Sequence, residues 1–227
     1  MFRAVIFDFD GVIADSEPLH FEAFRLVLAD RGVEIPKARY YADYLGYSDV
    51  DCIKEMNRDF DLSLDRSGCD ELLRQKGVVF DKLAAKSNII IDGAAEFIDM
   101  LGANGIVIAV CSGSLYDEIM LALKSSGFAD AFETIIAADD VSAGKPDPEG
   151  YLLALKRLNG SGEQNIAADD CVVIEDSHWG LESARGAGMH TIAITNTYSE
   201  SELADYAEIT VAKLCDISID NLKKLCD

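Results

Sequence analysis

The chain has 227 residues, of which 49% are hydrophobic and 27% charged, and its formal net charge is −21. This composition is typical of a soluble globular protein with one large domain or two unequal ones, and the acidity makes nucleic acid and anionic membranes poor partners. A small phosphorylated partner is not excluded, because a bound cation and a few lysines can reverse the sign of the charge in a pocket.

The sequence predicts a cytoplasmic protein without a membrane anchor. Its six cysteines form no Cys-x-x-Cys pair, and Cys111 and Cys171 border apolar runs, where buried free thiols are common. This usage indicates a reducing compartment rather than a disulfide framework. No signal peptide is expected before the first apolar run, and no run approaches the roughly 20 residues of a membrane span. We expect a monomer or a weak homodimer.

The first predicted element is a buried strand over residues 3–9, in a segment that contains Asp8 and Asp10 and continues into Gly11. Apolar residues then recur at helical spacing from Glu17 to Arg31. Residues 37–86 keep helical periodicity throughout and contain no convincing strand. We therefore expect residues 15–87 to form an inserted all-helical cap domain.

Strands and helices alternate in the rest of the chain. This alternation predicts an α/β fold with a Rossmann-like parallel sheet and helices on both faces, formed by residues 1–14 and 88–227. The expected strands are 106–111, 134–137, 171–174, 190–194 and 209–211, and the expected helices are 94–101, 114–125, 148–158, 177–185 and a terminal helix.

Asp8 and Asp10 are the first candidates for chemistry. In an extended strand, side chains two residues apart point to the same face, so these carboxylates would start out close together. Carboxylates this close require a cation, a shared proton or abundant water. A cation at this position would be a hard, oxygen-seeking ion such as Mg²⁺. The alternative is a pair of solvated loop residues.

Three further groups of polar residues follow later strands. They are Ser112 with Gly113, Lys145 in the loop before a helix, and Glu175 with Asp176. The carboxyl ends of parallel strands share one edge of the sheet, where ligands bind. Carboxylates, a hydroxyl, amide groups and a lysine suit a metal-bound phosphoryl group. Taken singly, each group has an ordinary alternative: a helix N-cap for Ser112, a surface lysine, and an acidic pair favoured by a helix dipole.

These residues resemble the four ordered motifs of the haloacid dehalogenase superfamily. The motifs are Asp8–Val12, Ser112, Lys145–Pro146 and Glu175–Ser177, and the helical insertion after the first motif also agrees. The resemblance covers the whole chain. It is strongest to the branch of phosphatases and phosphomutases related to phosphoglycolate phosphatase and β-phosphoglucomutase.

The resemblance implies distinct roles for the two aspartates. Asp8 matches the nucleophile, which forms an aspartyl-phosphate. Asp10 matches the general acid and base, and its backbone carbonyl matches a Mg²⁺ ligand. The metal set that the resemblance implies is Asp8, Asp10, Asp176 and the supporting carboxylate Glu175.

The resemblance also implies a phosphate-binding set of Ser112, Lys145 and the Gly113 amide. The cap loop with Gly46 and Tyr47 is the candidate for substrate contact. We therefore expect a Mg²⁺-dependent phosphatase that hydrolyses a small phosphorylated metabolite, such as a sugar phosphate or a phosphoglycolate-like compound.

Other reactions remain as alternatives. Dehalogenases of this group lack the second aspartate, so dehalogenation is disfavoured. A phosphonate hydrolase would use a cap lysine, for which Lys37 and Lys54 are present. A β-phosphoglucomutase-like enzyme carries lysine and arginine in its cap loop where this chain has Leu45 and Asp49, and an aspartate would repel a second phosphate. A non-catalytic phosphate-binding protein is the remaining alternative.

Overall fold

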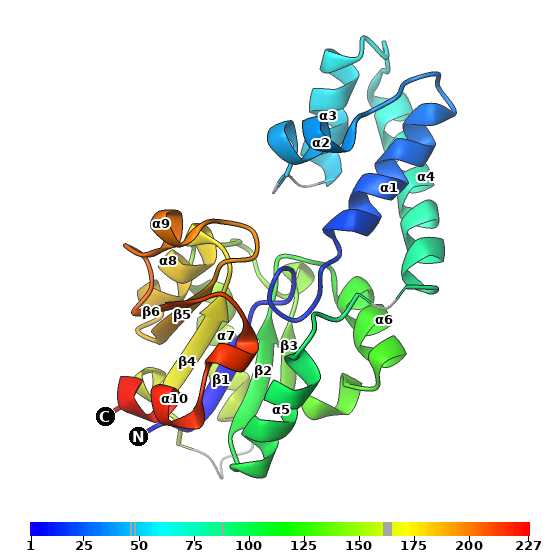
Figure 1. Ribbon diagram of the computed structural model, residues 1–227. Coiled ribbons are helices and arrows are strands. Elements are labelled where there is room, and N and C mark those ends of the chain that lie inside the picture. Colours follow the sequence, from blue (N-terminus) through cyan, green and yellow to red (C-terminus); the bar gives the residue numbers. More distant parts are fainter. Residues whose placement is uncertain (46, 48, 88, 161–164) are drawn as a thin grey trace. The chain divides into compact units, whose positions relative to one another are not determined.

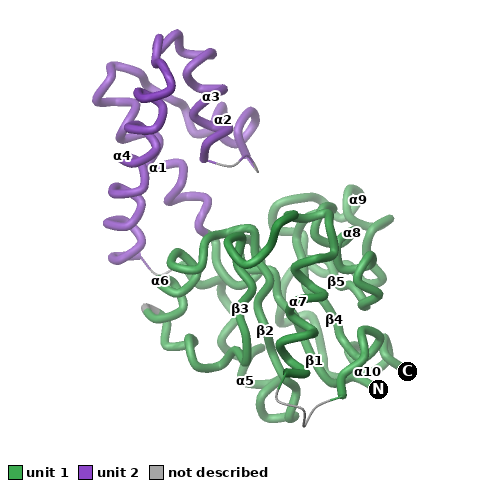
Figure 2. The backbone as a smooth tube through the Cα atoms, turned by 180° about the vertical axis from the view of Figure 1, so that it is seen from behind, with its two compact units in different colours: residues 1–15, 89–227 green, residues 16–88 purple. Residues whose placement is uncertain are grey.

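The computed structural model describes residues 1–45, 47, 49–87, 89–160 and 165–227 (Figure 1). The chain forms two compact units, each with its own hydrophobic core (Figure 2). Residues Met1–Asp15 and Ile89–Asp227 form the core unit, and residues Ser16–Asn88 form the cap unit. Among the described residues, no helix is both long enough and apolar enough to cross a bilayer.

The core unit is built on a six-stranded parallel sheet with the order β3-β2-β1-β4-β5-β6. The predicted Rossmann-like α/β fold is thereby confirmed. Because the first strand is central, the strands that follow it in sequence are added on either side. The bounds are β1 Ala4–Phe7, β2 Val107–Cys111, β3 Thr134–Ile136, β4 Cys171–Glu175, β5 His190–Ile194 and β6 Ile209–Val211.

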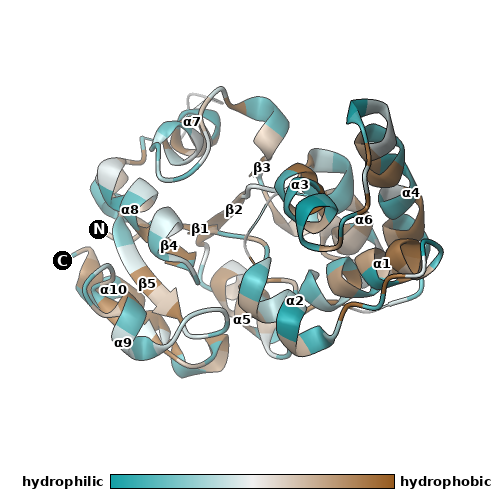
Figure 3. Ribbon diagram, turned by 90° about the horizontal axis from the view of Figure 1, so that it is seen from above, coloured by the Kyte–Doolittle hydropathy of each residue, from teal (hydrophilic) through white to brown (hydrophobic). Residues whose placement is uncertain are grey.

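Helices cover both faces of this sheet. Alternate residues of β1 divide between the two layers: Val5 and Phe7 pack with α5 and α6, whereas Ala4 and Ile6 pack with α7 and α8. In Figure 3 the apolar strands β1 and β4 are coloured predominantly brown. The helices are α5 Ala94–Ala103, α6 Tyr116–Ser126, α7 Glu149–Leu158, α8 His178–Gly186, α9 Glu200–Leu203 and α10 Ile219–Leu225, with 3-10 turns at Ala129–Ala131, Ala138–Asp140, Ala168–Asp170 and Leu214–Asp216.

The cap unit consists, in its described residues, of helices and their connections. The α1 and α4 helices pack side by side, and α3 packs against α4. Their shared core contains Phe24, Leu28, Tyr40, Ile53 and Leu72. The bounds are α1 Glu17–Ala29, α2 Lys37–Asp43, α3 Asp49–Asp59 and α4 Arg66–Ala84.

Several element ends differ from the sequence predictions by one or two residues, and two of them lie near left-handed glycines. The β1 strand ends at Phe7 rather than at residue 9, because the backbone turns back after it: Gly11 N donates to Ala14 O at 2.7 Å and Gly11 has a φ of +80°. The α8 helix includes Gly186, and the left-handed residue beyond it is Gly188, with a φ of +76°. Glycine suits both left-handed positions because it has no Cβ.

Candidate active site

The order of the strands brings the predicted site residues to one edge of the sheet. The β1 strand lies between β2 and β4, so the residues that follow these three strands are neighbours. Asp8 N donates to Ile174 O at 2.9 Å, which continues the pairing with β4 by one residue beyond β1. Ser112 N donates to Ile136 O at 2.9 Å in the same way. This edge is where parallel α/β sheets bind ligands.

A partly buried lysine and three buried carboxylates form the centre of the site. Lys145 Nζ lies 2.5 Å from Asp8 Oδ1 and 2.6 Å from Glu175 Oε1. Oxygen atoms of Asp8, Glu175 and Asp176 lie within 4.8 Å of one another, and these residues are 7%, 1% and 5% exposed. One lysine charge cannot balance three carboxylates, so the cluster suits an additional cation.

The hydrogen bonds of Glu175 give it a supporting place in this cluster. Its Oε1 accepts from Lys145 and, at 3.3 Å, from the Tyr151 hydroxyl. Its Oε2 accepts at 2.9 Å from the backbone N of Asp176 and from both the backbone N and the hydroxyl of Ser177. Both oxygens of Glu175 therefore hold other parts of the site in place.

Burial changes the proton affinity of the cluster. Loss of solvent raises the pKa of Asp8 well above its ordinary value, although Lys145 opposes the shift. Burial and the neighbouring Glu175 charge raise the pKa of Asp176 to about 7. Burial opposes the charged form of Lys145, but the Asp8 and Glu175 charges outweigh it and raise the pKa of Lys145 well above its usual value. The ionised carboxylates thus need more positive charge than one lysine supplies.

The donor set fits Mg²⁺. Hard cations prefer carboxylate and carbonyl oxygens, and Mg²⁺ in particular is usually bound through only one or two protein carboxylates. Asp8 and Asp176 would supply these carboxylates, and Glu175, with both oxygens in hydrogen bonds, would orient its neighbours. This separation agrees with the supporting role expected for Glu175.

Asp10 lies in the turn after β1, and the premise that it shares a strand face with Asp8 is wrong because the strand ends first. Its Oδ2 accepts from the Ser114 hydroxyl at 2.5 Å. Among the described residues, the group of carboxylates close enough to share an ion contains Asp8 but not the side chain of Asp10. The two aspartates therefore have different surroundings, as separate chemical roles require.

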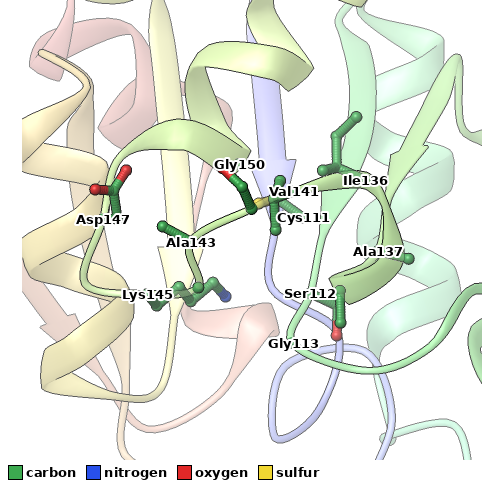
Figure 4. Close-up of a pocket in the computed structure, with 13 residues that line it drawn as sticks. Cys111, Ser112, Gly113, Ile136, Ala137, Val141, Ala143, Lys145, Asp147 and Gly150 are labelled. Atoms are coloured by element: carbon green, nitrogen blue, oxygen red, sulfur yellow. The ribbon is translucent and has the colours of Figure 1, made fainter.

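The predicted phosphate-binding residues line one cavity of about 240 Å³. Ser112 and Gly113 enter it from the end of β2, and Lys145 from the loop before α7 (Figure 4). Glu149 shapes this loop by accepting from the backbone N of Ser142 at 3.1 Å and of Ala143 at 2.9 Å. The structure thus brings together all three predicted phosphate-binding residues of the core unit.

The predicted substrate-contact residues of the cap are Gly46 and Tyr47. Gly46 lies outside the described residues, and Tyr47 is 52% exposed. Asp49, which was expected to repel a second phosphate, is paired within the cap unit: its Oδ2 lies 2.6 Å from Nζ of the buried Lys76. The repulsion is therefore weaker than the sequence suggested, but the pairing also offsets the charge of Lys76.

Several residues that hold the site together had no assigned role in the sequence analysis. Ser114 contacts Asp10, Tyr151 contacts Glu175, and Thr197 contacts Asp176. Ser114 and Thr197 could have been found by the rule that identified the others, because both follow the ends of buried strands. Tyr151 has no such signal, because it resembles an ordinary apolar position of α7.

The raised pKa of Asp176 gives a testable pH dependence. Between about pH 4 and pH 7 the unfolded state has an ionised Asp176 while the folded state retains the proton, so stability falls as pH rises. We expect the free energy of unfolding of Asp176→Asn minus that of wild type, measured in urea with EDTA, to grow by a few kcal/mol from about pH 5 to about pH 8. The subtraction cancels the titrating groups that do not interact with Asp176. Added Mg²⁺ should reduce this increase in the stability difference. A stability difference that does not change with pH would contradict the raised pKa of Asp176.

Comparison with known proteins agrees with this geometry. The family model for haloacid dehalogenase-like hydrolases matches residues 2–188. The validoxylamine A 7'-phosphate phosphatase of Streptomyces hygroscopicus subsp. limoneus is 28% identical over 217 residues, covering 96% of each chain. The phosphorylated carbohydrates phosphatase of Thermotoga maritima is 30% identical over 191 residues, covering 84% of this chain and 83% of its own.

A solved structure shows the same fold. CbbY from Rhodobacter sphaeroides, in complex with phosphate, aligns with a TM-score of 0.83 and 26% identity, over 98% of this chain and 100% of that chain. The family and these relatives confirm the prediction of a phosphoric monoester hydrolase. Because the family model matches most of its length, the chain belongs to the haloacid dehalogenase-like hydrolase family.

Proposed function

We propose that this protein is a Mg²⁺-dependent phosphatase that hydrolyses a small phosphorylated metabolite through an aspartyl-phosphate on Asp8. The observation that carries the proposal is the buried cluster in which Lys145 bridges Asp8 and Glu175 beside Asp176. Such a site offers a nucleophilic carboxylate, a cation for the phosphate oxygens and a place for a divalent ion.

In the first step, an Asp8 oxygen attacks phosphorus and the bond from phosphorus to the leaving oxygen breaks. Asp10 gives its proton to that oxygen, so that the product leaves as an alcohol. Lys145, Ser112 and the Gly113 amide bind the phosphoryl oxygens and stabilise the charge that builds up on them. Ser114 holds the Asp10 carboxylate through its hydroxyl.

In the second step, water attacks phosphorus, Asp10 takes the proton, and the bond to Asp8 breaks to release inorganic phosphate. Asp8, Asp176 and the backbone carbonyl of Asp10 would hold Mg²⁺, which would neutralise negative charge at the phosphoryl group. Glu175 orients Lys145 and the start of α8 throughout.

A panel of phosphate esters tests the proposal and identifies the substrate. Sugar phosphates, phosphoglycolate and a chromogenic ester should be incubated with Mg²⁺ or with EDTA, and phosphate release followed. We expect release that depends on Mg²⁺ and differs strongly between esters. The exposed Tyr47 and its neighbour Gly46 are proposed to select the substrate, so Tyr47→Ala should change the ranking. No release from any ester would leave the phosphate-binding alternative in its place.

A phosphomutase is the second candidate. It would need a cation in the cap for a second phosphate, and the charge of the buried Lys76 is already offset by Asp49. Incubation with β-glucose 1-phosphate separates the two reactions. Glucose 6-phosphate without free phosphate would establish the mutase, whereas free phosphate supports the phosphatase.

The lysines considered for phosphonate chemistry lie at the surface of the cap unit. Lys54 is 64% exposed in its side chain and pairs with Asp51 at 2.9 Å, and Lys37 lies over the ring of Tyr41. A Schiff-base lysine is activated by desolvation or by another cation, and an exposed lysine paired with an aspartate has neither. The phosphate ester therefore remains the proposed substrate class.

A further inference from the structure

The carboxyl end of β5 contributes two side chains to the site, although no sequence motif pointed there. Asn196 Nδ2 donates to the backbone oxygen of Gly11 at 2.6 Å. The Thr197 hydroxyl donates to Asp176 Oδ2. The β5 strand pairs with β4 as far as Glu175, which places these two residues beside the end of β4.

The turn at Gly11 is tightly packed against Asp176. Gly11 has a φ of +80°, and a Cβ built on it would overlap the Asp176 carboxylate. The turn after β1 therefore packs directly against one side of Asp176, while Thr197 holds Oδ2 from the end of β5. Asn196 ties that turn to the same segment. Together these contacts restrict the rotation of the Asp176 carboxylate.

We propose that Thr197 is a positioning residue, which fixes the carboxylate of Asp176 in the orientation that binds the divalent cation. A hydroxyl that donates to one carboxylate oxygen leaves the remaining lone pairs for a metal, and such partners of metal ligands orient them and tune affinity. The identity of the cation rests on the proposed function. The test below uses Mg²⁺ alone and needs no substrate.

A purely structural role for Thr197 makes a different prediction. Thr197 is exposed, and the nearby Ser199 hydroxyl also forms a local hydrogen bond, to Glu202 at 2.6 Å. If Thr197 only stabilised this loop, its removal would act like removal of Ser199. If it orients Asp176, its removal should weaken cation binding while Ser199→Ala leaves binding unchanged.

The experiment compares Thr197→Val, Thr197→Ser and Ser199→Ala with wild type. Mg²⁺ is titrated by calorimetry and by the fluorescence of Trp179, which is the single tryptophan of the chain and lies three residues after Asp176. We expect Thr197→Val to weaken Mg²⁺ binding by about 10-fold to 100-fold. Thr197→Ser keeps the hydroxyl and should restore most of the affinity. Thermal unfolding in EDTA checks that all variants are folded.

Equal Mg²⁺ affinity of Thr197→Val and wild type would overturn the inference and leave the proposed function intact. An equal loss in Ser199→Ala would overturn it as well, because the effect would then come from the loop as a whole. If wild type itself bound no Mg²⁺, both the inference and the proposed cation would be wrong. If Mg²⁺ bound as expected but no ester were hydrolysed, the positioning role would stand and the proposed phosphatase reaction would not.

Discussion

Asp8→Asn should abolish turnover without destabilising the protein. The amide cannot attack phosphorus, so we expect kcat to fall by about 10⁴-fold or more, as for other enzymes that lose their nucleophile. Its oxygen can still accept from Lys145, which lies 2.5 Å from Asp8 Oδ1. Because burial raises the pKa of Asp8, a neutral side chain should be tolerated at least as well as the charge in metal-free protein.

Two measurements separate these effects. Phosphate release is followed with Mg²⁺ on the best ester of the panel, and urea unfolding is followed in EDTA near pH 7. Asp99→Asn is the matched control, because Asp99 is an exposed carboxylate on α5 and should keep wild-type activity. Substantial turnover by Asp8→Asn would contradict the aspartyl-phosphate route. A large loss of stability would contradict the view that the Asp8 charge is costly in the folded state.

Lys145→Met should damage both activity and stability. Lys145 is the partly buried cation between Asp8 and Glu175, and those two carboxylate residues are 7% and 1% exposed. Removing one partner of a buried ion pair typically costs about 3–5 kcal/mol, because the remaining charges lose their compensation. Loss of a donor to the phosphoryl oxygens should lower kcat by about 10²-fold to 10³-fold.

The double variant Lys145→Met/Asp8→Asn distinguishes charge from packing. It removes one of the uncompensated carboxylates, so we expect urea unfolding in EDTA to show partial recovery of stability, with no recovery of activity. Lys156→Met, at an exposed position of α7, is the control and should resemble wild type. A Lys145→Met variant as stable as wild type would mean that the neighbouring carboxylates are protonated rather than held as ions.

The sequence alone determined which strands carry the chemistry. Buried parallel strands appear as apolar runs, and the polar residues that follow them must meet at one edge of the sheet. This rule, with the family resemblance, was enough to select Asp8, Ser112, Lys145 and Asp176. It did not predict the local position of Asp10 relative to Asp8, because the strand ends at Phe7 and a turn with a left-handed glycine follows.

The tertiary structure alone decided how these side chains share their partners. Sequence position fixes the edge at which a residue lies, but the partner of a carboxylate depends on loops that converge from distant segments. Thus both oxygens of Glu175 are engaged by protein donors, and Asp176 is held by Thr197, 21 residues away. The pairing of Asp49 with Lys76 in the cap unit likewise depends on how α3 packs against α4. Only folding brings such groups within hydrogen-bonding distance, where the cost of burying a charge makes each pairing specific.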